Sequence, residues 1–189
     1  MIRPSMDDLP RFDTPDGFRI RNYRDGDADE WVRIHELADL YNKVTQETFE
    51  REFGYDMPAM RDRGFFMEAP NGEVIGTATA WYSSAGPGVE IQGQLNYGRV
   101  HWVALVPQYQ GRGLSKPLLS RVMSRLAESH DKSYLVTSSA RLPAIHLYLK
   151  YGFRPFLHSL ESIEAWEFVS IQLKHPLLEK TYWEPAARR

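Results

Sequence analysis

The stretch PQYQGRGLS at residues 107–115 is the strongest indication of the fold of this 189-residue chain. A nearly continuous apolar run at 100–106 precedes it and predicts a strand buried on both faces. Apolar side chains then recur at helical spacing as far as Leu126 and predict an amphipathic helix. Gly111 and Gly113 lack a Cβ, so an anion can approach the backbone there, where the first N–H groups of the helix are unpaired. The junction predicts an anion site, although a plain glycine-rich turn fits the local pattern equally well.

Other phosphate-binding and nucleophilic loops do not fit this junction. It lacks the Lys-Ser/Thr pair of a Walker loop and the third glycine of a dinucleotide-binding loop. Ser115 is not followed by the closing glycine of a nucleophile elbow.

The pattern along the rest of the chain predicts a mixed α/β protein. Asn71-Gly72 lies between two strand-like runs and predicts a hairpin. The predicted strands cover residues 18–23, 65–69, 74–82, 100–106, 134–137, 153–158 and 168–173, and the predicted helices cover 27–41, 45–53, 114–126 and 143–152. Residues 83–96 read as a long loop. We expect one domain over 18–175, a lead-in at 1–17 and a tail at 176–189.

Composition excludes several classes of function. The net charge is −2 and the pI is about 6.3, so no basic face for nucleic acid is predicted. The chain has no Cys, which removes disulfides, thiolate metal sites and a cysteine nucleophile. No signal peptide and no membrane-length apolar run are visible, so we expect a cytoplasmic protein without a membrane partner.

Two segments resemble one family. LVPQYQGRGL at 105–114 is similar to the coenzyme A pyrophosphate loop of the GNAT superfamily of acyl-CoA-dependent N-acyltransferases. The family pattern Gln/Arg-x-x-Gly-x-Gly/Ala aligns with Gln110, Gly113 and Ser115, and a register two residues earlier, from Gln108, also fits. AIHLYLKYGF at 144–153 is similar to a later family signature, although Arg141 stands where Asn is common.

The resemblance implies a GNAT fold with a mixed sheet of about six to seven strands and about four flanking helices. It implies transfer of an acetyl group from acetyl-CoA directly to an amine through a ternary complex, with no metal. Tyr148 would be the acid that protonates the leaving thiolate, and His101 the base. The implied cofactor-binding residues are Leu105, Val106, Gln110, Gly111, Arg112, Gly113, Leu114, Ser115 and Arg141.

From the residues alone, simpler roles remain open. Tyr148 also fits a core aromatic, and His101 also fits a strand residue bonded to backbone. Aromatic residues at 81, 82, 97 and 102 and carboxylates at 47, 50, 52 and 56 suit an amine pocket, but they suit a core and a solvated helix face better. The other histidines form no metal-like pair.

A second function also remains open. The same fold without catalysis would give an acyl-CoA-binding sensor or regulatory module, because fold alone does not establish activity. For either function the predicted partner is an amine-bearing molecule or acyl-CoA, and the chain is expected to be a monomer or homodimer. The sequence does not identify the acceptor.

Overall fold

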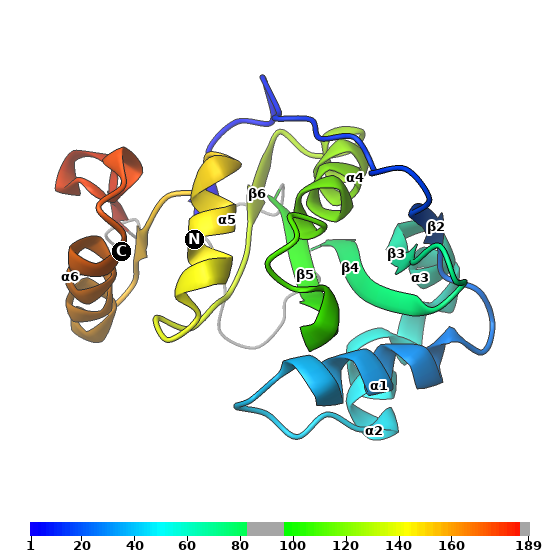
Figure 1. The fold of residues 1–189 in the computed structure, drawn as a ribbon. Coiled ribbons are helices and arrows are strands. Elements are labelled where there is room, and N and C mark those ends of the chain that lie inside the picture. Colours follow the sequence, from blue (N-terminus) through cyan, green and yellow to red (C-terminus); the bar gives the residue numbers. More distant parts are fainter. Residues whose placement is uncertain (83–96, 186–189) are drawn as a thin grey trace. The chain divides into compact units, whose positions relative to one another are not determined.

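The computed structural model describes residues 1–82 and 97–185. The helices and strands are β1 Ile2–Arg3, β2 Arg19–Asn22, α1 Asp27–Ala38, α2 Gln46–Phe53, α3 Met57–Arg63, β3 Gly64–Glu68, β4 Val74–Tyr82, β5 Tyr97–Leu105, α4 Ser115–Ala127, β6 Lys132–Tyr134, α5 Leu142–Lys150, β7 Phe156–Leu157, α6 Leu160–Leu173 and β8 Glu184–Pro185 (Figure 1). Short 3-10 helices are η1 Gly54–Asp56, η2 Pro107–Tyr109, η3 Pro176–Leu178 and η4 Lys180–Tyr182.

The described strands form a mixed sheet, which confirms the predicted fold class. Hydrogen bonding runs in the order β1-β6-β5-β4-β3-β2, and β7 pairs with β8 in a separate small sheet. The pairs β2–β3 and β3–β4 are antiparallel, whereas β5 pairs with β6 in parallel. The parallel pair follows from the intervening helix α4, because parallel neighbours need a crossover connection.

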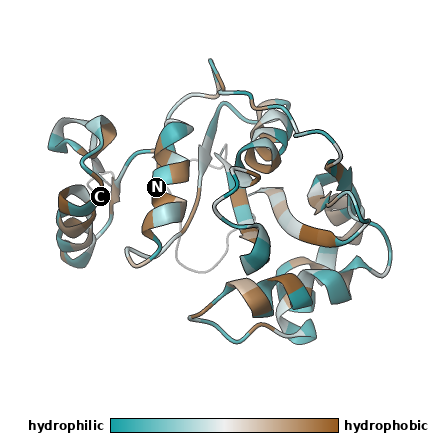
Figure 2. Ribbon diagram, in the orientation of Figure 1, coloured by the Kyte–Doolittle hydropathy of each residue, from teal (hydrophilic) through white to brown (hydrophobic). Residues whose placement is uncertain are grey.

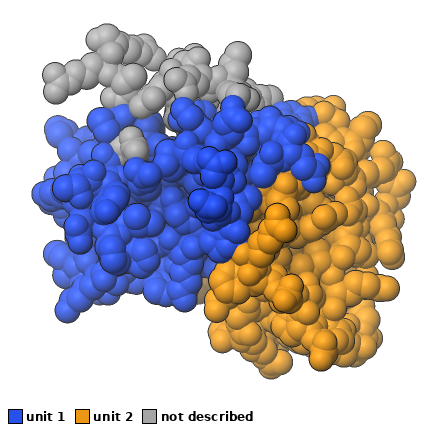
Figure 3. Space-filling view, turned by 90° about the horizontal axis from the view of Figure 1, so that it is seen from above, with its two compact units in different colours: residues 1–10, 82–99, 126–189 blue, residues 11–81, 100–125 orange. Residues whose placement is uncertain are grey.

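The chain divides into two compact units, which Figure 3 colours separately. The first contains residues 1–10, 82–99 and 126–189, and the second contains residues 11–81 and 100–125. Strand β5 contributes residues to both units.

In the second unit, α1 and α2 lie side by side (Figure 1) and contribute an aromatic core. Trp31 of α1 is fully buried, and its ring lies edge-on to Phe49 and Phe53 of α2 at centroid distances of 5.3 and 5.7 Å. Thr45 caps α2 by accepting a hydrogen bond from the Thr48 N–H. Helix α4 carries hydrophobic and hydrophilic residues along its length (Figure 2), as its amphipathic pattern predicted.

The hairpin predicted from Asn71-Gly72 is confirmed. Gly72 has φ +84°, a conformation that favours glycine, and its N–H donates to the Ala69 carbonyl at 2.9 Å. The flanking strands β3 and β4 pair with Phe66 opposite Thr77.

In the first unit, two expectations require correction. The lead-in at 1–17 contains β1, which pairs with β6 with Ile2 opposite Tyr134. The closing strand predicted at 168–173 is wrong, because these residues form the end of α6. Ser159 caps that helix, and Ser162, Trp166 and Val169 are buried at the spacing of one helical face.

Candidate functional site

The loop between β5 and α4 is fixed at its entrance by backbone and amide hydrogen bonds. The Val106 N–H donates to the Ile75 carbonyl of β4 at 2.9 Å, which extends the pairing one residue beyond β5. Gln110 Nε2 donates to the Leu105 carbonyl at 2.8 Å. The side chain of Gln110 therefore connects the loop to the end of β5. This contact fixes the direction in which the backbone enters the two glycines.

Gly111 and Gly113 both occupy the left-handed region of backbone conformation. Their φ angles are +74° and +80°, where a residue with a Cβ is strained. A Cβ placed on either glycine would meet no other protein atom within 4 Å. The space in front of both glycines is therefore open, so it remains available to a ligand.

Backbone donors line the same loop. Among the described residues, the N–H groups of residues 111–115 make no hydrogen bond with another backbone or side-chain group. They lead into α4, a helix of 13 residues whose N-terminal end adds a favourable potential for anions. Pro117, which has no N–H, lies in the first turn, where no intrahelical partner is lost. We call residues 110–115 the anion loop.

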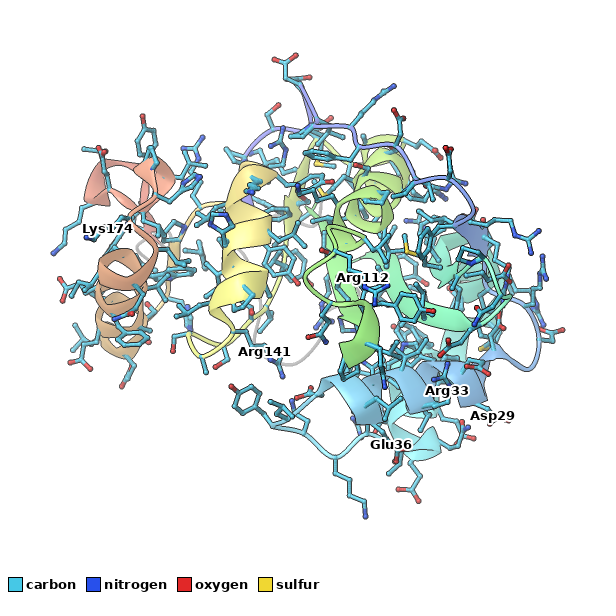
Figure 4. All side chains as sticks on the ribbon, in the orientation of Figure 1. Asp29, Arg33, Glu36, Arg112, Arg141 and Lys174 are labelled. Carbon is cyan, nitrogen blue, oxygen red and sulfur yellow. The ribbon has the colours of Figure 1, made fainter. Side chains whose placement is uncertain are left out.

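Two side chains of the anion loop have distinct surroundings. Leu114 is 2% exposed and anchors the start of α4 in the core. Arg112 extends from the loop (Figure 4), and its guanidinium lies 4.9 Å from the centroid of the Tyr109 ring. The loop thus offers a positive side chain beside its backbone donors, the combination that an oxyanion such as a pyrophosphate requires.

Strand β5 departs from regular geometry just before this loop. Trp102 has φ +48°, a strained value for a bulky residue. Successive side chains of a regular strand point to opposite faces. Here His101 packs on Phe53 of α2 at 5.6 Å between ring centroids, and its neighbour Trp102 packs on Trp31 of α1 at 4.9 Å. The distortion at Trp102 therefore turns two consecutive rings toward the two adjoining helices.

His101 has an acidic partner that sequence reasoning missed. Its Nε2 lies 2.9 Å from Oε2 of Glu52 on α2, and the His101 residue is only 7% exposed. The sequence pattern places Glu52 among the carboxylates of a solvated helix face, but in the structure its side chain is only 23% exposed. The two residues are 49 positions apart, so no local sequence pattern could predict their contact.

Tyr148 of α5 and Arg141, the residue just before this helix, lie in the first unit. Arg141 stands at the N-terminal end of this helix (Figure 4). Tyr148 is 8% exposed, and its ring lies 6.1 Å from that of Phe153. Burial raises the pKa of Tyr148 to about 12, and the charge of Arg141 acts in the opposite direction. The phenol is therefore neutral and keeps its proton at physiological pH.

The predicted site residues are thus distributed over both units. His101, Leu105, Val106 and the anion loop lie in the second unit, whereas Arg141 and Tyr148 lie in the first. Their roles in binding and catalysis stay predictions.

Most of the other candidate side chains have structural contacts. Trp81 is 1% exposed and donates from Nε1 to the Tyr55 hydroxyl at 2.9 Å, and Tyr97 is 4% exposed. Asp56 caps α3 by accepting from the Ala59 N–H at 3.0 Å. The predicted long loop at 83–96 lies outside the described residues.

The described part of the chain holds neither a metal-binding cluster nor a helix that could span a membrane. Within residues 1–82 and 97–185, no three His, Asp or Glu side chains surround a common metal position. The described helices are all too short or too polar to cross a bilayer.

Comparison with known proteins places these features in one family. The family model described as Acetyltransferase (GNAT) family matches residues 34–153. An N-alpha-acetyltransferase of Sulfurisphaera tokodaii is 28% identical over 143 residues, which cover 72% of this chain and 80% of that protein. A mycothiol acetyltransferase of a Nocardioides species is 30% identical over 172 residues, which cover 81% of this chain and 55% of that protein. The chain spans about half the length of the mycothiol acetyltransferases that it matches.

A solved structure shows the same fold. The putative acetyltransferase yncA from Salmonella typhimurium, in a structure with its cofactor acetyl-CoA, superposes with a TM-score of 0.57. The two chains are 20% identical, and the match covers 72% of this chain and 79% of the other.

Proposed function

The chain belongs to the GNAT acetyltransferase family, and from this premise we propose that it transfers an acetyl group from acetyl-CoA directly to an amine. The anion loop is the observation that carries the proposal. Its two open glycines, its backbone donors and the positive charge of Arg112 support the binding of a pyrophosphate at this loop. The row of backbone donors at the start of α4, which have no protein partner among the described residues, distinguishes this loop from the hairpin turn at Gly72, whose N–H donates to the Ala69 carbonyl.

Acetyl-CoA, when bound, supplies a thioester carbonyl for attack and a thiolate leaving group. The residues that would hold its pyrophosphate are Gly111, Arg112, Gly113, Leu114 and Ser115, through their backbone N–H groups and the Arg112 guanidinium. Leu105, Val106 and Gln110 shape the approach to the loop, and Arg141 is a candidate contact from its position before the second family signature.

His101 is the proposed base. An alkyl amine is mostly an ammonium ion at neutral pH and must lose a proton before it can attack. A neutral imidazole accepts that proton directly or through one water molecule. The burial of His101 beside aromatic rings supports this role, because a ring shielded from bulk water keeps a defined orientation.

Tyr148 is the proposed acid, and this role rests on its match to the second family signature. The neutral phenol carries a proton that a departing thiolate could take, although the burial that raises its pKa also makes it a weaker acid. Tyr151, which we expect to pack rather than react, is fully buried.

The test is acetyl transfer by the purified chain to a panel of amines. The names of the relatives justify including peptide α-amines and small-molecule amines in that panel. Mass spectrometry of the amine and release of free CoA report the reaction. Acetylation of at least one amine that is much slower in His101→Gln supports the proposal. Acetyl-CoA binding without transfer to any amine would instead assign the chain to the sensor or regulatory class.

A further inference from the structure

The carboxylate of Glu52 is the feature of this fold that the proposed mechanism leaves unused. It comes from the last turn of α2 and approaches the buried ring of His101 on β5. The Nε2–Oε2 distance of 2.9 Å is that of a hydrogen bond, and both partners are shielded, with side chains 8% and 23% exposed. We propose that Glu52 is a positioning residue that fixes the tautomer of His101 and stabilises its protonated form during catalysis. This inference rests on the proposed function.

The chemistry follows from which nitrogen carries the proton. An ionised carboxylate only accepts hydrogen bonds, so Nε2 of His101 must be the protonated nitrogen that donates to Glu52. In the neutral ring the lone pair is then on Nδ1, and Nδ1 is the atom that accepts a proton. Without Glu52 the ring would exchange between two tautomers, and only one of them would place the lone pair on Nδ1.

In the proton transfer, an N–H bond of the acceptor ammonium breaks, and its proton forms a new bond to Nδ1 of His101. The electron pair that stays on the amine nitrogen is then free to attack. His101 becomes an imidazolium with both nitrogens protonated, and Glu52 stays ionised beside it. The opposite charge favours the imidazolium over the neutral ring.

The backbone geometry of β5 makes this contact possible. The left-handed conformation of Trp102 turns consecutive side chains toward the helices, so His101 faces α2 while Trp102 faces α1. Phe53, the residue after Glu52, packs edge-on to the His101 ring and to Trp81 of β4. These aromatic rings keep the pair in an apolar setting, where an ionic hydrogen bond is stronger than in water.

Charged and titratable side chains of two neighbouring helices lie near the pair. Nη2 of Arg51, also on α2, lies 3.5 Å from Oε1 of Glu52, and its side chain is 66% exposed. On α1, His35 faces Trp102 at 5.0 Å between ring centroids, and the Trp102 ring lies 5.9 Å from that of His101. The aromatic contacts from β4 carry no charge. Glu52 is therefore the acidic group in direct contact with His101 among these neighbours.

The experiment compares Glu52→Gln with wild type in single-turnover acetyl transfer across pH. Gln keeps an oxygen that accepts the Nε2–H hydrogen bond but removes the negative charge. Because the imidazolium then loses its counter-charge, the His101 ring gives up its proton at a lower pH than in wild type. The acidic limb of the rate should therefore move to lower pH by about one unit or more. His101→Gln should abolish that limb. Glu36→Gln, which removes an exposed carboxylate of α1 (Figure 4), should leave it in place.

A second measurement needs no turnover. The ¹⁵N–¹H spectrum of the histidine rings, with His101 assigned by its absence in His101→Gln, should show the Nε2–H tautomer in wild type. In Glu52→Gln the His101 signal should titrate at lower pH, with helical content and melting temperature close to wild type.

Either result can overturn the inference. An Nδ1–H tautomer in wild type, or an acidic limb that Glu52→Gln leaves unmoved, would reduce the pair to a structural contact. A loss of rate in Glu52→Gln that is equal at every pH would likewise show that the pair is only a structural contact. If the wild type acetylates no amine, the proposed function fails and the catalytic part of the inference fails with it, while the ring spectra still decide whether Glu52 fixes the tautomer.

Discussion

Substitution of Gly113 by Ala separates ligand binding from backbone strain. At φ +80° an added Cβ strains the backbone by about 1–2 kcal/mol. For a chain of this size that strain lowers the melting temperature by about 2–8 °C. The Cβ would contact no protein atom, so no further loss of packing is expected. It would instead occupy the open space in which an anion approaches the loop.

The expected loss of affinity follows from the donors in that space. A hydrogen bond to a charged group contributes about 1.5–3 kcal/mol. Displacing the pyrophosphate from one such donor should weaken acetyl-CoA binding at least tenfold, which corresponds to about 1.4 kcal/mol. Isothermal titration calorimetry with acetyl-CoA measures this directly. Gly113→Val, with a larger side chain, should weaken binding further.

The chain provides a matched control in Gly72. This glycine has φ +84°, and its Cβ would also meet nothing within 4 Å, but it lies in the hairpin turn between β3 and β4. Gly72→Ala should therefore lose similar stability and keep wild-type affinity for acetyl-CoA. Equal affinities of Gly113→Ala and Gly72→Ala, both folded, would refute the assignment of the anion loop to the pyrophosphate.

Three further predictions concern catalysis, acid stability and packing. Tyr148→Phe should lower the single-turnover rate by about 10²–10⁴ with little change in acetyl-CoA affinity, and a wild-type rate would remove Tyr148 from the mechanism. Burial raises the pKa of Glu68, but hydrogen bonds from Arg21 and Arg19 outweigh it and leave that pKa lowered. The stabilisation by ionised Glu68 is therefore present above its ordinary pKa and is lost as the pH falls through its lowered pKa. The loss of unfolding free energy in Glu68→Gln, measured by urea unfolding, should therefore shrink below about pH 4. A loss that does not depend on pH would contradict this. The added methyl of Gly76→Ala would overlap the Leu105 side chain and should lower the free energy of unfolding by about 1–3 kcal/mol in the same assay. Unchanged stability would show that Leu105 and β5 move aside without cost.

The features that were predictable from the sequence depend on local chemistry. Asn71-Gly72 specifies its hairpin because a tight turn needs positive φ, and the strand–glycine–helix order at 105–115 specifies the anion loop. Both signals lie within about ten residues of the structure they encode.

The error at α6 shows the limit of such signals. Residues 168–173 are rich in side chains that favour strands, yet the capping box at Ser159 and the burial of Trp166 and Val169 on one face impose a helix. The cap was present in the sequence, but it lies nine positions before Phe168. The cap at Ser159 and the helical spacing of the apolar residues after it together favour a helix over the whole segment.

Non-local pairs were not predictable. Ile2 pairs with Tyr134, and Glu52 reaches His101 only because α2 packs beside a distorted β5. Such contacts depend on tertiary packing, and a single sequence does not encode them in any local spacing.

The central claim is direct transfer of an acetyl group from acetyl-CoA to an amine. The most direct test is a single turnover with isotope-labelled acetyl-CoA, quenched over time and analysed by mass spectrometry of protein, amine and CoA together. We predict that labelled acetyl-amine and free CoA appear at the same rate and in equal amounts, while the protein is never acetylated, because the chain has no Cys to carry the group. A labelled protein that forms before the acetyl-amine, or CoA released without any acetylated amine, would contradict direct transfer.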